Sequence, residues 1–244
     1  MGPDERSEPE RRRLVELMLL FARLPPPPDP HGCFPRYAEL RARFTEVAAA
    51  GADAETLEEA FLELYAHLHM HEAPYSRAER RRMDETGGYW CHAGGLSPIL
   101  KAADWIGPTT ISADFGAGNG LQCLLMQKLA PHEKTVQIEI SSRMVEIGQQ
   151  LQAWLGIARA RVDWIVADVS HIEPKDMDFV YLYRPVRPTG PGRAFYERFA
   201  AALEASRRPV VVFSIADCLR DFLSARFEVF YGDGHLTCFR GPIS

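Results

Sequence analysis

The stretch ISADFGAGNGLQ, residues Ile111 to Gln122, places three glycines within five positions directly after a run that alternates like a β-strand. Gly116, Gly118 and Gly120 remove side chains where a backbone must turn sharply and approach a ligand closely. Backbone amides at the start of the helix that follows can receive a carboxylate. The loop DFGAGNG is therefore the first candidate binding element of the chain.

Strand and helix patterns alternate from about residue 97 to the end of the chain. Strands are predicted at TTISADF, KTVQIEI, VDWIVAD, MDFVYLYR and PVVVFSI, with a helix pattern between most of them and another, DCLRDFLSA, after the fifth. Two last strands, RFEVFYGD and HLTCFRG, meet across Gly232, Asp233 and Gly234. Parallel strands need crossover helices, whereas a tight turn joins antiparallel strands. We therefore expect an α/β fold with a seven-stranded, mostly parallel, doubly wound sheet that ends in an antiparallel hairpin.

The first 88 residues form a predicted helical region, and residues 89–244 form the α/β domain. Helix patterns cover about residues 7–24, 34–50 and 54–69, and a basic helix, SRAERRRM, follows. The run PPPPDP at 25–30 favours a stiff extended spacer between the first two. Leu57, Phe61, Leu64 and Leu68 share one face of the third helix, so this region is expected to pack on the domain and to cap its substrate site.

Composition and charge set expectations about partners and compartment. The chain has 244 residues, is 46% hydrophobic and carries a net charge of −5, which argues against a general affinity for nucleic acid. Five cysteines without a CxxC pair indicate free thiols, and the first apolar run is too interrupted for a signal peptide. A cytoplasmic protein without a membrane partner is expected. His67, His69 and His71 are spaced by two, which scatters them around a helix, so no metal is expected.

The sequence resembles the class I S-adenosylmethionine-dependent methyltransferases over residues 89–244. The resemblance is carried by DFGAGNG after the first strand, by Glu139 at the end of the second and by Asp168 at the end of the third. It implies S-adenosylmethionine as cofactor, with Glu139 accepting hydrogen bonds from the ribose, Asp168 meeting the adenine amino group, and Ile140 and Val169 flanking the ring. The expected cofactor-binding residues are Asp114, Gly116, Ala117, Gly118, Asn119, Gly120, Glu139, Ile140, Asp168 and Val169.

Three other interpretations compete with this one. The nicotinamide dinucleotide-binding fold requires a small residue five positions after the first glycine of the loop, Gly116, but Leu121 occupies that position. A protein that binds the cofactor without catalysis would use the helical region to bind a partner. A protein methyltransferase would use the same helices as a docking surface. Turnover with a defined acceptor separates these interpretations.

The acceptor side is expected at FVYLYRPVRPTGPG, where the fourth strand ends. Arg184 is expected to hold an anionic small-molecule acceptor by bidentate hydrogen bonds, and Tyr183 to wall the site. Tyr89 and Trp90 form a second candidate wall, because aromatic rings pack well around a sulfonium cation. His92 is a candidate general base. Tyr183, Arg184 and His92 are the predicted catalytic residues.

Overall fold

A seven-stranded sheet forms the centre of the molecule in a computed structural model that describes residues 6–69, 75–89, 95–216 and 218–242. The strand order is β3-β2-β1-β4-β5-β7-β6, and β7 runs antiparallel to both of its neighbours. The other paired strands are parallel. This arrangement confirms the expected doubly wound sheet with its closing hairpin. The strands are β1 (Ile111–Phe115), β2 (Lys134–Glu139), β3 (Val162–Val166), β4 (Phe179–Leu182), β5 (Val210–Ile215), β6 (Glu228–Gly232) and β7 (Leu236–Gly241).

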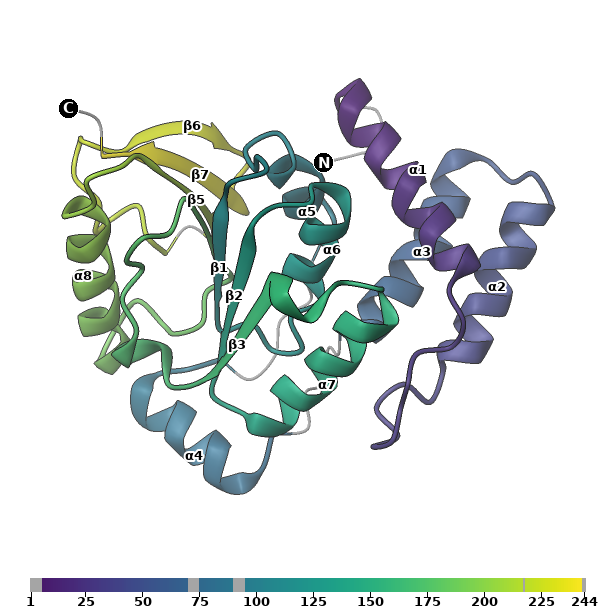
Figure 1. The fold of residues 1–244 in the computed structure, drawn as a ribbon, viewed down its shortest axis with the longest axis horizontal. Helices are drawn as coiled ribbons and strands as arrows, with labels where there is room; N and C mark the ends of the chain where they lie inside the picture. The colour runs from purple at the N-terminus through teal and green to yellow at the C-terminus, as the bar shows by residue number, and fades with distance from the viewer. Residues whose placement is uncertain (1–5, 70–74, 90–94, 217, 243–244) are drawn as a thin grey trace.

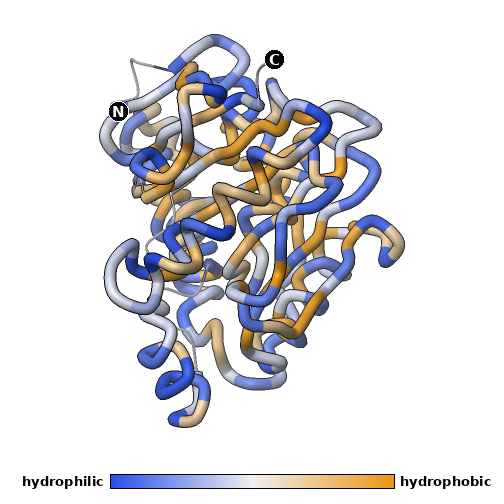
Figure 2. The backbone as a smooth tube through the Cα atoms, turned by 90° about the vertical axis from the view of Figure 1, so that its left-hand side faces the viewer, coloured by the Kyte–Doolittle hydropathy of each residue, from blue (hydrophilic) through white to orange (hydrophobic). Residues whose placement is uncertain are grey.

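Helices cover both faces of the sheet, as the alternation of strand and helix patterns predicts (Figure 1). On one face, α5–α7 share a hydrophobic core with the sheet, and on the other α8 closes a second core. Hydrophobic segments run through the middle of the molecule, and much of the outer chain is hydrophilic (Figure 2). The helices are α1 (Glu8–Arg23), α2 (Tyr37–Ala49), α3 (Ala54–Leu68), α4 (Arg77–Thr86), α5 (Ser97–Ala102), α6 (Leu121–Leu129), α7 (Ser142–Trp154) and α8 (Pro191–Glu204).

The first three helices lie against α5–α7, on the side away from α8 (Figure 1). Phe61, Leu64 and Leu68 of the predicted apolar stripe are fully buried, and Leu57 is partly buried. Trp154, at the end of α7, donates from its indole nitrogen to the carbonyl of Pro25 at 2.7 Å. Its ring also meets Phe21 edge-on, with centroids 5.9 Å apart. The proline spacer is therefore held against the α/β domain.

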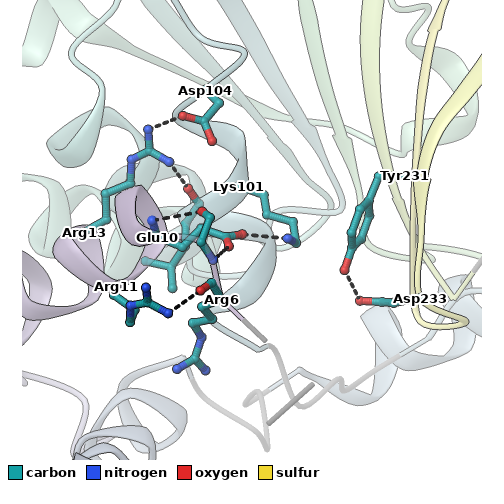
Figure 3. A network of polar contacts seen from close by, with 10 residues as sticks. Arg6, Glu10, Arg11, Arg13, Lys101, Asp104, Tyr231 and Asp233 are labelled. Atoms are coloured by element: carbon teal, nitrogen blue, oxygen red, sulfur yellow. Dashed lines mark hydrogen bonds and ion pairs between the residues drawn. The ribbon is translucent and has the colours of Figure 1, made fainter. Parts of the chain in front are cut away.

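A polar network joins the start of α1 to α5 (Figure 3). Glu10, in the first turn of α1, accepts from the Ser7 amide at 2.7 Å and completes a capping box with that residue. Its other carboxylate oxygen accepts from Lys101 Nζ of α5 at 2.6 Å. Arg13 donates to the carbonyl of Leu100 at 2.8 Å and pairs with Asp104. The helix predicted to begin near Ser7 is therefore capped by the Glu10 carboxylate, and the same carboxylate anchors it to α5.

The helix expected at DCLRDFLSA does not form over the described residues 218–225, which make turns instead. The amides of Phe222 and Leu223 both bond to the carbonyl of Leu219, so a single turn closes without propagating. The amide of Ser224 bonds to the carboxylate of Glu204 at 2.7 Å. This side-chain acceptor replaces the carbonyl that a continuing helix would offer. Across the described part of the chain, no helix has the length and apolarity needed to cross a membrane.

Candidate functional site

A pocket opens where β1, β2 and β4 end, beside α4 and the end of α3. Its volume is about 850 Å³ when the solvent at its mouth is included. The glycine loop, Glu139 and Asp168 lie at the carboxyl ends of β1, β2 and β3, which share one edge of the sheet. All three therefore contribute to the wall of the pocket. The lining residues are His69, Tyr75, Met83, Thr86, Gly88, Tyr89, Asp114, Gly116, Ala117, Gly118, Gln122, Glu139, Ile140, Met144, Asp168, Val169, Tyr181, Tyr183, Pro185 and Val186.

The glycine loop divides into a part that faces the pocket and a part that faces the protein. Gly116 and Gly118 line the pocket at φ +85° and +59°, values that favour glycine. Asn119 is buried instead, and its side-chain amide donates to the carbonyl of Leu68 at 2.7 Å. Gly120 packs where an added Cβ would lie 2.5 Å from the Trp164 ring. Asn119 and Gly120 therefore shape the loop, while the first half of the loop forms the pocket wall.

Glu139 is a buried carboxylate that binds the loop. Its two oxygens accept from the amide of Gly118 at 2.8 Å and from the amide of Ser141 at 2.9 Å. Burial raises its pKa to about 7, against the lowering effect of these amides. Asp168 lies at the end of β3 and accepts from the Ser170 amide at 2.9 Å. Both carboxylates line the pocket, as the resemblance implies, together with Ile140 and Val169.

Asp114, at the end of β1, is expected to make the stability of the protein depend on pH. Burial raises its pKa to about 7, assisted by the nearby charge of Glu139 and opposed by a hydrogen bond with Cys123. An unfolded aspartate has a pKa of about 3.9, so between these values the folded protein holds a proton that the unfolded chain lacks. This contribution to stability is present at low pH and is lost as the pH rises through 7.

Replacing Asp114 by Asn should remove that dependence. The free energy of unfolding of Asp114→Asn minus that of the wild type should increase with pH, by up to about 1.4 kcal/mol per unit between about pH 5 and 7. Urea unfolding at several pH values measures it. A difference that stays constant over this range would contradict the prediction.

A second wall of the pocket comes from residues that sequence reasoning missed. Gln122, in the first turn of α6, accepts at its carbonyl oxygen from the hydroxyl of Tyr181 on β4. Its amide nitrogen donates to the hydroxyl of Tyr65 on α3 at 3.0 Å. Gln122 is the last residue of the stretch ISADFGAGNGLQ, but no local pattern indicates partners more than 50 positions away. His69 was considered only as a metal ligand, and it too lines this wall.

Tyr183 lines the pocket, whereas Arg184 lies beside it. The Tyr183 ring meets Tyr181 and His235 edge-on, with centroids 6.4 and 6.2 Å away. The Arg184 guanidinium lies 4.6 Å from the centre of the Tyr89 ring, and that of Arg187 lies 4.9 Å from it. Gly88 and Val186 form a β-bridge that holds the two segments together. These arginines therefore fix Tyr89 at the pocket wall. The predicted residues Trp90 and His92 lie outside the described residues.

The described part of the chain, which includes His67 and His69 but not His71, contains no group of three side chains placed to hold a metal. His67 faces away from the pocket: its Nε2 accepts from the Arg36 amide at 3.2 Å. The predicted absence of a metal stays a prediction.

Comparison with known families and structures gives one family and several similar folds. A family profile described as a methyltransferase domain matches residues 113–186. Among curated proteins, none matches the chain. An RNA methyltransferase from Salinibacter ruber, in complex with S-adenosyl-L-homocysteine, is 19% identical, with 59% of this chain and 87% of that one covered and a TM-score of 0.46. A putative rRNA methylase from Clostridium thermocellum is 12% identical, with coverages of 61% and 94% and a TM-score of 0.48. A putative methyltransferase from Streptococcus mutans, in complex with S-adenosyl-L-homocysteine, is 10% identical, with coverages of 59% and 94% and a TM-score of 0.43.

The expectation that no nucleic acid takes part is contradicted, because the similar structures include proteins described as RNA methyltransferases and rRNA methylases. The physical error lies in the use of the overall charge of −5. Phosphate binding depends on the residues at the contact surface, which a net charge does not describe. The anionic acceptor held by Arg184 is not retained either, since that guanidinium lies over Tyr89.

Proposed function

We propose a small-molecule acceptor for this chain, which is a class I S-adenosylmethionine-dependent methyltransferase. S-Adenosylmethionine is its cofactor. The observation that carries the proposal is one pocket lined both by the glycine loop, Glu139 and Asp168 and by Gln122, Tyr181 and Tyr183.

The residues present fit the cofactor. Gly118 leaves open space, since an added Cβ would meet only the tip of Met144 at 3.9 Å, and its neighbours Gly116 and Ala117 line the same cradle. Asp114, Glu139 and Asp168 give the pocket three carboxyl groups, which suit a ligand with an ammonium, a sulfonium and hydroxyl donors. We assign Gly116, Ala117 and Gly118 to the amino-acid end, Glu139 to the ribose, and Asp168 with Ile140 and Val169 to the adenine.

The protein contributes alignment and exclusion of water. When bound, the cofactor supplies an electrophilic methyl group on a sulfonium. In-line transfer needs the acceptor atom held close to that methyl, with water kept away. The rings of Tyr89, Tyr181 and Tyr183 also line the pocket and add aromatic surface to its wall. Residues 1–88 extend this wall through the end of α3 and α4, so we propose them as a cap on the domain of residues 89–244.

Binding and turnover test the proposed function. Calorimetry should show that S-adenosylmethionine and S-adenosylhomocysteine bind with micromolar dissociation constants. Transfer of a tritiated methyl group should then be followed in two arms, a panel of small molecules with hydroxyl, amine or heterocyclic nitrogen acceptors, and total RNA with synthetic oligonucleotides. Label in a small molecule supports the proposal. Label in RNA alone overturns the small-molecule acceptor, and cofactor binding without transfer in either arm supports a binding protein.

A further inference from the structure

We infer that Tyr196 of α8 is a positioning residue for the cofactor pocket: its hydroxyl fixes the backbone of residues 185–187, and this segment holds Gly116 of the glycine loop in place. The inference rests on the proposed function and deepens it, because it assigns a role in cofactor binding to a residue that does not line the pocket. Tyr196 belongs to α8, on the face of the sheet away from the first three helices (Figure 1).

The hydroxyl of Tyr196 has a specific partner inside the second hydrophobic core. Tyr196 is fully buried, and its hydroxyl donates to the carbonyl of Val186 at 2.8 Å. Its ring stacks on that of Phe222, with centroids 5.3 Å apart, and meets Phe195 edge-on at 5.0 Å. A phenylalanine would fill the same space among these rings, so the hydroxyl serves the backbone of residues 185–187. Burial raises the pKa of Tyr196 well above its usual value, which keeps the hydroxyl protonated and able to donate.

The segment 185–187 follows a turn that residues other than glycine rarely make. The chain leaves β4 through Arg184, whose φ is +43°, in the left-handed region. A conformation of this kind costs free energy and persists only where the surroundings hold it. The bond from Tyr196 to Val186 lies directly after this turn, so it is placed to hold the segment in its course.

The segment 185–187 is also paired with the chain that follows α4. Gly88 and Val186 form an antiparallel β-bridge, and the amide of Tyr89 donates to the carbonyl of Pro185 at 3.1 Å. The backbone bonds of this bridge leave from the residues on either side of Val186. The carbonyl of Val186 is therefore left for another donor, which Tyr196 supplies from α8.

The segment packs directly on the glycine loop. A Cβ added to Gly116 would lie 2.8 Å from the Cβ of Pro185, closer than side chains approach in folded proteins. Pro185 therefore packs where only a glycine fits. The amide of Gly116 donates to the carbonyl of Ile138 on β2 at 3.0 Å, so this glycine is held between β2 and Pro185. Because Gly116 and Pro185 both line the pocket, a movement of the segment changes the shape of the pocket wall.

Removal of the Tyr196 hydroxyl acts on the pocket through these contacts. The carbonyl of Val186 would be left buried without its donor, which costs more than the bond itself contributes. The segment then shifts to find another partner for this carbonyl, and Pro185 moves against Gly116. The amino-acid end of the cofactor, which the proposed assignment places at the glycine loop, loses its fit. Tyr196→Phe should therefore weaken cofactor binding from outside the pocket.

Calorimetry with S-adenosylhomocysteine tests the inference. Tyr196→Phe should raise the dissociation constant by about fivefold or more, at a temperature where the variant is fully folded. The matched control is Ser112→Ala, which removes a buried hydroxyl bonded to His132 near the start of β1. Urea unfolding should show a loss of stability in both variants, but the affinity of Ser112→Ala should stay within about twofold of the wild type.

Two outcomes of this titration overturn the inference. One is a Tyr196→Phe variant that binds S-adenosylhomocysteine as tightly as the wild type. The other is an equal loss of affinity in Ser112→Ala, because general destabilisation would then explain both results. Failure of the wild type itself to bind S-adenosylhomocysteine overturns the proposed function and the inference together, and the wild-type titration alone reveals it.

An amide correlation spectrum of the isotope-labelled full chain gives a readout that needs no ligand. The signal of the Gly116 amide should move in Tyr196→Phe and keep its position in Ser112→Ala, because only the first variant disturbs residues 185–187. A role of Tyr196 in stability alone would leave the Gly116 signal in place. An unmoved Gly116 signal in Tyr196→Phe therefore overturns the inference while the proposed function stands.

Discussion

Glu139→Ala should lose most of the affinity of the protein for S-adenosylhomocysteine. Glu139 is buried in the pocket wall, and its carboxylate already orders the loop by accepting from Gly118 and Ser141. Each carboxylate oxygen has a second lone pair, which leaves room for the two ribose hydroxyls. The substitution removes these acceptors and the anchor of the loop at once. We expect a loss of about 1.5–3 kcal/mol, or roughly 10- to 150-fold in the dissociation constant measured by calorimetry.

Two further variants separate ribose binding from general damage. Glu139→Gln keeps the size of the side chain and one carbonyl acceptor, so its affinity should lie between those of the wild type and Glu139→Ala. Asp163→Ala removes an exposed carboxylate from the neighbouring strand β3, where it pairs with Lys134, and should leave the affinity unchanged. An affinity of Glu139→Ala within threefold of the wild type would place the ribose elsewhere.

The fold, and the meeting of the glycine loop with Glu139 and Asp168 in one pocket, could be predicted from sequence because each depends on local patterns. Strand alternation, crossover helices and the turn at Gly232 and Gly234 together define the sheet. In parallel strands the carboxyl ends share one edge, so Glu139 and Asp168 meet the glycine loop without any knowledge of side-chain packing. The place of each of these residues in the fold is set by its position along its strand, and side-chain packing adds little to that placement.

The rest of the pocket lining could not be predicted because long-range contacts build it. Gln122 binds Tyr65 and Tyr181, residues that lie 57 and 59 positions away in opposite directions along the chain. Asn119 belongs to the most informative motif, yet it serves Leu68 of the helical region. Arg184 has the chemistry of an anion clamp, but its place over Tyr89 depends on a β-bridge between Gly88 and Val186. A single sequence carries no signal for such pairings.

The second large effect is expected at Lys101, which links the helical region to the α/β domain. Glu10 of α1 is buried, and burial acts to raise its pKa, but hydrogen bonds from Lys101 and Ser7 outweigh burial and lower it. Glu10 is therefore ionised in the folded protein. The Lys101 ammonium also lies 4.3 Å from the centre of the Tyr231 ring, so one side chain joins α1, α5 and the hairpin.

Lys101→Ala should lower the free energy of unfolding by about 3 kcal/mol, because it strands a buried carboxylate without its cation. Urea unfolding of the full chain measures this loss. The double variant Glu10→Gln/Lys101→Met removes both charges and keeps the apolar stem, so it should recover at least half of it. Lys175→Ala, which breaks the exposed pair with Glu173, should leave the unfolding midpoint unchanged.

If Lys101→Ala were as stable as Lys175→Ala, α1 would not be anchored through the ion pair of Glu10 and Lys101, and the proposed cap would need another attachment. Recovery in the double variant, as expected, would show that the loss of stability in Lys101→Ala comes from the stranded charge and that the apolar faces of the helices keep them packed.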